Sequence, residues 1–67
     1  MTNPDLASIS AELAVIAEGA DRYRERVAEL AGRDLGENDD LLSAIHEAER
    51  ALRTAHRSLL RATRLAG

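Results

Sequence analysis

Hydrophobic residues recur every three or four positions along two segments that fill most of the 67-residue chain. In the first segment the spacing is 3-4-3-4-3-4-3 without interruption, as in a helix that packs along one apolar stripe. This pattern predicts a helix from residue 4 to residue 31. The residues of its stripe are Leu6, Ile9, Leu13, Ile16, Ala20, Tyr23, Val27 and Leu30.

The second segment repeats the pattern with a spacing of 4-3-4-3-4-3-4 and predicts a helix from residue 39 to residue 65. Bulky residues alternate with alanine along most of this stripe, an arrangement that favours layers of large against small side chains. Its residues are Leu41, Ile45, Ala48, Leu52, Ala55, Leu59, Ala62 and Ala66.

Residues suited to helix ends stand at the predicted boundaries. Asn3 is suited to the N-cap of the first helix, and Asn38 or Asp39 to that of the second. Gly32 follows the first stripe, where a glycine in the left-handed conformation often ends a helix. Residues 32–38 are therefore the connection, and we expect Leu35 to fold back over that end.

A connection of this length joins antiparallel neighbours, so we predict an all-α fold. The fold is a single domain over residues 1–67, a two-helix antiparallel hairpin like a short coiled coil. The predicted register pairs Leu13 with Ala55 and Ile16 with Leu52. A register shifted by half a heptad is the alternative. Tyr23 is expected in the core, and Gly19 is expected to allow close approach to residues 48–51 rather than to form a hinge or ligand notch.

Charge supports the antiparallel arrangement. The net charge is −3, but residues 1–21, 22–33, 34–49 and 50–67 carry −4, +2, −6 and +5. Folding the chain back on itself places segments of opposite sign side by side. Exposed ion pairs contribute only about 0–1 kcal/mol each, so this pattern selects orientation more than it stabilises.

Most positions beside the two stripes are small or apolar rather than charged, so each apolar surface is wider than a single seam. The chain also has no cysteine, and small scaffolds without disulfides or metals usually depend on oligomerisation. We therefore predict a homodimer, most simply a dimeric four-helix bundle. The expected oligomer interface, at the open end of the hairpin, comprises Leu6, Ile9, Leu13, Val15, Ile16, Leu59, Leu60 and Leu65.

No pattern in the chain indicates catalysis, a metal site or a cofactor. His46 and His56 are too far apart for an i, i+4 metal pair, and Gly32 and Gly36 follow no strand, as a phosphate loop requires. We predict a non-enzymatic protein with no catalytic residues, metal ligands or cofactors. A small helical enzyme would need arginines that point into the bundle, whereas most arginines of this chain fall on outward-facing positions.

Every basic residue is arginine, and five of them share one outward face of the second helix. We call Arg50, Arg53, Arg57, Arg61 and Arg64 the arginine face. It indicates either a solvated face that balances the acidic first helix or a strip that binds an anionic partner. Our first hypothesis is an interaction or structural module with a possible protein partner. The alternative is a small nucleic-acid-binding or regulatory protein that uses the arginine face. It is disfavoured because no aromatic residue is interleaved with these arginines for base stacking.

No run approaches the roughly 20 apolar residues of a membrane span, and no secretory signal pattern is present. The sequence predicts a cytoplasmic protein without membrane association, with leaderless export as the alternative. In architecture and composition the chain resembles the secreted helical-hairpin proteins of actinobacterial type VII systems. Those proteins often carry a Trp-x-Gly turn, whereas residues 32–36 contain no Trp, so we assign no family.

Overall fold

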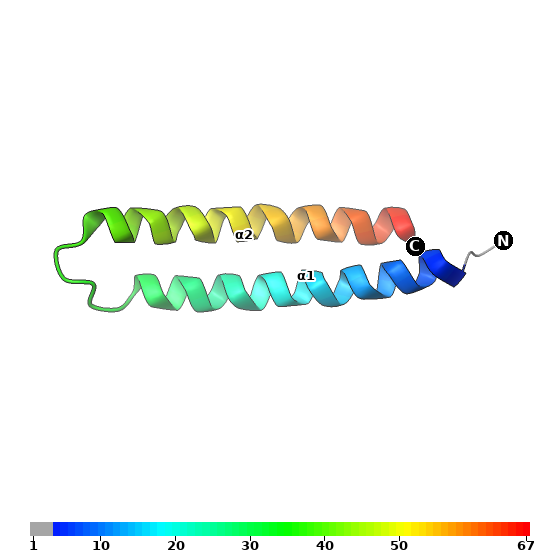
Figure 1. The fold of residues 1–67 in the computed structure, drawn as a ribbon, viewed down its shortest axis with the longest axis horizontal. Helices are drawn as coiled ribbons and strands as arrows, with labels where there is room; N and C mark the ends of the chain where they lie inside the picture. Colours follow the sequence, from blue (N-terminus) through cyan, green and yellow to red (C-terminus); the bar gives the residue numbers. More distant parts are fainter. Residues whose placement is uncertain (1–3) are drawn as a thin grey trace.

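A computed structural model describes residues 4–67, which form two helices joined by a short loop (Figure 1). Helix α1 spans Pro4–Ala31 and helix α2 spans Asp39–Ala66. The helices lie side by side along their length, with the loop at one end and the first turn of α1 and the last turn of α2 at the other. The predicted all-α hairpin is confirmed. The N-cap expected at Asn3 lies outside the described residues.

The loop differs from its prediction at the end of α1. The Gly32 N–H donates to the Glu29 carbonyl at 3.1 Å, so the last turn tightens and needs no left-handed residue. The left-handed glycine is Gly36, with φ of 67°, and its N–H donates to the Asp34 carboxylate at 2.9 Å. The prediction of a left-handed C-cap at Gly32 is therefore wrong, because the chain reverses direction later in the loop.

At the start of α2, the side chain of Asn38 accepts a hydrogen bond from the Leu41 N–H at 3.0 Å. This bond satisfies one of the free backbone donors of the first turn, so Asn38 is the N-cap. Asp39 and Asp40 follow it in the first turn, where negative charge is favourable.

Helix α1 turns a different stripe toward α2 than its hydrophobic pattern predicts. The seam contains every seventh residue from Ser10, and Ala17 within it is only 1% exposed. The residues one position earlier, Ile9, Ile16, Tyr23 and Leu30, are 43–60% exposed. The core placement of this line, including Tyr23, is therefore wrong. The seam is displaced by one position, roughly 100° around the helix.

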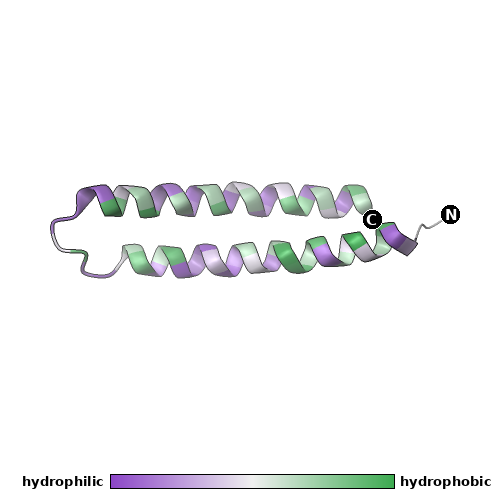
Figure 2. Ribbon diagram, in the orientation of Figure 1, coloured by the Kyte–Doolittle hydropathy of each residue, from purple (hydrophilic) through white to green (hydrophobic). Residues whose placement is uncertain are grey.

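Helix α2 keeps most of its predicted seam, with Ile45, Leu52 and Leu59 half-buried. The register, however, is shifted: the Ser10 hydroxyl donates to the Thr63 carbonyl at 3.1 Å, whereas the predicted pairing places residue 10 beside residue 58. The shift is slightly more than one helical turn. It follows the rotation of α1, which sets small residues of α1 against the bulky seam of α2. Figure 2 shows hydrophobic ribbon recurring turn by turn on both helices.

Gly19 lies on the side of α1 turned away from α2, because it follows the buried Ala17 by two positions. A Cβ atom built there meets only the guanidinium of Arg22, at 4.0 Å. The predicted close approach to residues 48–51 is therefore wrong.

Replacing Gly19 with alanine should raise the free energy of unfolding by about 0.5–1 kcal/mol, because the site is helical and open. Urea denaturation followed by circular dichroism at fixed protein concentration measures this. Gly36→Ala is the matched control and should lower stability by about 1–2 kcal/mol, since residue 36 has positive φ. Destabilisation by Gly19→Ala would contradict the open environment.

The Asn38→Ala variant should lose about 1 kcal/mol of stability, because the first turn of α2 loses its side-chain acceptor. The same denaturation measurement applies. Asn38→Asp retains an acceptor and should remain close to the parent protein. Equal losses in both variants would show that the cap bond contributes nothing.

Candidate interaction surface

The rotation of α1 leaves one side of the hairpin without any charged residue. Residues at seven-residue intervals share a line along a helix that packs like a coiled coil. On α1, the line from Leu6 to Val27 lies next to the seam. The exposed line from Ile9 to Leu30 lies one line further from the seam. Both lines consist only of apolar side chains, apart from the Tyr23 hydroxyl.

Helix α2 continues the same surface. On α2, the line from Leu41 to Ala62 lies next to the seam, and the line from Ala44 to Leu65 lies beyond it. The two apolar lines of α1 are arranged in the same way beside the seam of α1. An antiparallel pair has an approximate twofold axis perpendicular to the plane of the hairpin, so equivalent positions on the two helices share one face. We call this surface the uncharged face. It comprises Leu6, Ile9, Leu13, Ile16, Ala20, Tyr23, Val27, Leu30, Leu41, Ala44, Ala48, Ala51, Ala55, Ser58, Ala62 and Leu65.

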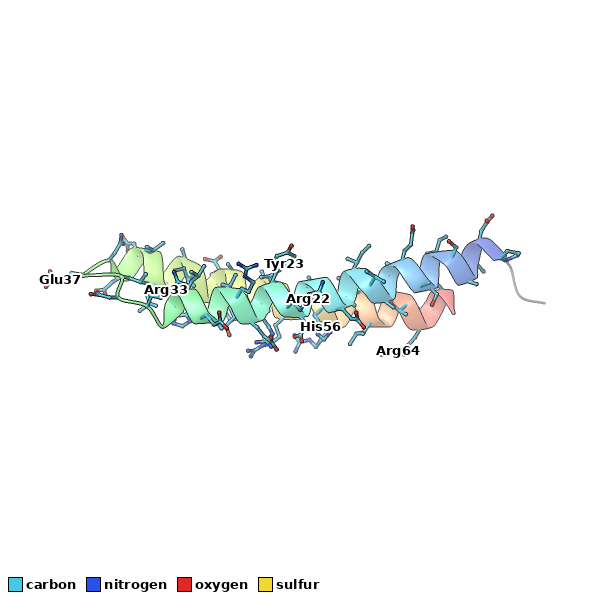
Figure 3. The ribbon with its side chains drawn as sticks, turned by 90° about the horizontal axis from the view of Figure 1, so that it is seen from below. Arg22, Tyr23, Arg33, Glu37, His56 and Arg64 are labelled. Carbon is cyan, nitrogen blue, oxygen red and sulfur yellow. The ribbon has the colours of Figure 1, made fainter. Side chains whose placement is uncertain are left out.

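The opposite side of the hairpin is polar. In the edge-on view of Figure 3, Tyr23 projects from one side and His56 from the other. The Arg53 guanidinium lies 3.3 Å from the Glu49 carboxylate on this polar side, and the ring of His46 lies 3.7 Å from the same carboxylate. At the seam, Arg24 is paired with Asp21 at 3.1 Å. The hairpin is therefore amphipathic across its thickness.

Large exposed apolar side chains are concentrated on the uncharged face. Among residues 4–67, nine large apolar residues are exposed, and all except Val15 and Leu60 belong to this face. Their clustering is informative, since scattered exposed apolar residues are normal whereas a large contiguous patch usually marks a contact surface.

The predicted interface residues fall into three groups. Leu13 and Leu59 are half-buried, Leu59 in the hairpin seam and Leu13 at the edge where the seam meets the uncharged face. Exposed positions on that face are held by Leu6, Ile9, Ile16 and Leu65. Val15 lies on the side of α1 turned away from α2, and Leu60 lies on the polar side.

Three surface residues, Tyr23, Leu30 and Leu41, were not predicted as such from the sequence. Their heptad spacing was visible, but it was assigned to the seam within the hairpin. The small size of Ser10, Ala17 and Ala31 on the neighbouring line is the signal that distinguishes the seam line from the surface line. Small residues permit close contact between the two helices of one hairpin and leave the bulky line free.

All five residues of the arginine face are exposed, on the outer and polar sides of α2. Arg53 is held by Glu49, through a hydrogen bond of 3.3 Å. The end of this face lies near the chain termini, as Arg64 in Figure 3 illustrates.

Three further features of residues 4–67 bear on metal binding, ligand binding and membrane insertion. Among residues 4–67, no group of three or more His, Cys, Asp or Glu side chains is placed to hold a metal ion. A shallow open hollow is lined by Ala11, Glu12, Val15 and Ile16, all from neighbouring turns of α1, with one titratable group among them. Neither helix in this range is both long and apolar enough to cross a bilayer.

Comparison of the chain with known protein families, with curated proteins and with solved structures finds no match.

Proposed function

We propose that the chain is a non-enzymatic interaction module. In this proposal, the hairpin self-associates through the uncharged face into a dimeric four-helix bundle and offers its outer helix faces to a protein partner. The observation that carries the proposal is the uncharged face, which runs along both helices with most of the large exposed apolar side chains on it.

The size of the face supports a stable contact. The Cα positions extend over 58 × 13 × 11 Å, so the broad side covers on the order of 750 Å², near the roughly 800 Å² that each partner contributes to a standard interface. Covering a half-exposed large apolar side chain contributes roughly 1 kcal/mol, about half the value for complete burial. Several such residues per copy are available to offset the cost of association.

A second candidate is binding of an anionic partner, including nucleic acid, by the arginine face. The specific observation in its favour is that Arg50, Arg57, Arg61 and Arg64 are exposed and form no ion pair within residues 4–67. Binding of this kind weakens steeply as salt increases. Titration of labelled DNA and RNA at two salt concentrations tests this candidate.

The Ile16→Asp variant should dissociate the dimer, because it buries an unpaired carboxylate in the contact. We expect its dissociation constant to rise by at least about 100-fold, which corresponds to roughly 3 kcal/mol. Sedimentation equilibrium across micromolar concentrations measures it. Val15→Asp is the matched control: Val15 is 64% exposed and Ile16 is 55% exposed, but only Ile16 lies on the uncharged face.

Equal loss of association in both variants would contradict the assignment of the face. A parent protein that remains a folded monomer at these concentrations would remove self-association itself from the proposal.

Tyr23 gives an independent measure, because it is the only aromatic residue of the chain and is 60% exposed in the single hairpin. Its fluorescence should become less accessible to acrylamide as protein concentration rises through the dissociation constant. In Ile16→Asp the accessibility should stay high at every concentration. Unchanged quenching in a parent protein that dimerises would place the contact elsewhere.

A further inference from the structure

The second copy of the chain has a defined orientation on the uncharged face. We infer that the two hairpins are related by a twofold rotation about their long axis, so that both loops lie at the same end of the bundle. Helix α1 of each copy then lies beside α2 of the other. This inference rests on the proposed self-association and adds the arrangement of the two copies.

Charge at the rim of the uncharged face supports this orientation. On each helix one further line borders the uncharged face on its outer side. On α1 this line carries Glu12 and then Arg26, with Arg33 following in the loop, and on α2 it carries Asp40 and Glu47 and then Arg61. Both lines therefore change from acidic to basic in the direction of the chain. Two such lines attract each other only when they run antiparallel.

Register also supports this orientation. The hydrogen bond from Ser10 to Thr63 places residue 10 of α1 beside the last turn of α2. Each step forward on α1 corresponds to one step back on α2, so residue 12 lies within about one turn of the level of residue 61, and residue 26 within about one turn of the level of residue 47. Rotation about the long axis causes no shift along it, so the same levels apply between the copies.

The consequence is a set of matched rim contacts. Glu12 of one copy faces Arg61 of the other, Arg26 faces Glu47, and the twofold axis repeats each contact. None of these four side chains has an ion-pair partner within residues 4–67 of its own hairpin. The rim charges are thus available for contacts between copies.

Side-chain size on the uncharged face supports the same orientation. The outer apolar line of α1 is bulky, with Ile16, Tyr23 and Leu30, whereas the equivalent line of α2 is mostly small, with Ala44, Ala51 and Ser58. In the inferred arrangement the bulky line of each copy lies against the small line of the other. Large against small gives uniform helix spacing and interdigitated packing.

The competing arrangement places the loops at opposite ends, with α1 beside the second α1. It also matches rim charges, because Glu12 then faces Arg26. It sets Ile16 and Tyr23 against each other on one side, however, and small residues against small residues on the other. The inferred arrangement does bring the acidic loops together, but those charges are exposed, and salt screens them over about 8 Å at physiological ionic strength.

The chain contains no cysteine, so one spin label can be placed at the tip of the loop through Glu37→Cys. Pulsed dipolar spectroscopy on the dimer should give a distance below roughly 35 Å, because neighbouring helices of a bundle lie about 10 Å apart. A distance near the 58 Å length of the hairpin would overturn the inferred arrangement and leave the proposed self-association intact. Absence of any dipolar coupling, with a monomer in sedimentation, would overturn both.

Charge reversal tests the rim contacts with matched variants. Glu12→Arg and Arg61→Glu should each weaken dimerisation about tenfold at low salt, and the double variant should return to within about twofold of the parent. The control double variant, Glu12→Arg with Arg26→Glu, should remain weak. Rescue by the control instead would indicate loops at opposite ends and overturn the inference. Helicity at dimer-forming concentrations confirms that each variant is folded.

Discussion

The rotation of α1 about its own axis is the constraint on which the rest of the structure depends. This helix carries more apolar surface than one neighbouring helix can cover, so contact with α2 must leave part of it outside. The structure places the line from Ser10 to Ala31, which is small except at Arg24, in the seam and leaves the bulky line from Ile9 to Leu30 exposed. Register, the amphipathic cross-section and the candidate interface all follow from that choice.

The contacts inside one hairpin are modest. Ala17 is the one buried apolar residue among residues 4–67, and the seam also contains the polar groups of Ser10 and Arg24. The Arg24–Asp21 pair is local and partly exposed, and such pairs contribute little to stability. A hairpin held only by this seam would gain more by rotating α1 and burying Ile16 and Tyr23. The observed rotation leaves the uncharged face without a cover inside the hairpin, which is the observation behind the proposed self-association.

Much of the fold was predictable from the sequence, because helix periodicity and end signals are local. Pro4–Ala31 as α1 and Asn38 as the cap of α2 both follow from residues within a few positions of each boundary. The rotation of α1 was not predictable in the same way. A heptad pattern identifies an apolar stripe but not the neighbour that covers it, and Ile16 fits the seam of a hairpin as well as the face of a bundle.

The left-handed glycine was misplaced for a related reason. Gly32 and Gly36 are both suited to positive φ, and only the hydrogen bonds of the loop decide between them. The register depended on geometry that spacing does not encode, namely the approach of Ser10 to Thr63.

The charge pattern is best understood together with this rotation. Within one hairpin, alternating blocks of charge are compatible with many registers, since exposed side chains adapt to several partners. Once α1 is rotated, the blocks divide into charges near the polar side, such as Glu49 and Arg53, and charges at the rim of the uncharged face, such as Glu12 and Arg61. The first group is already paired within the hairpin. The second group lies at the rim of the uncharged face. In the proposed dimer, the apolar area would supply affinity and the rim charges would supply orientation.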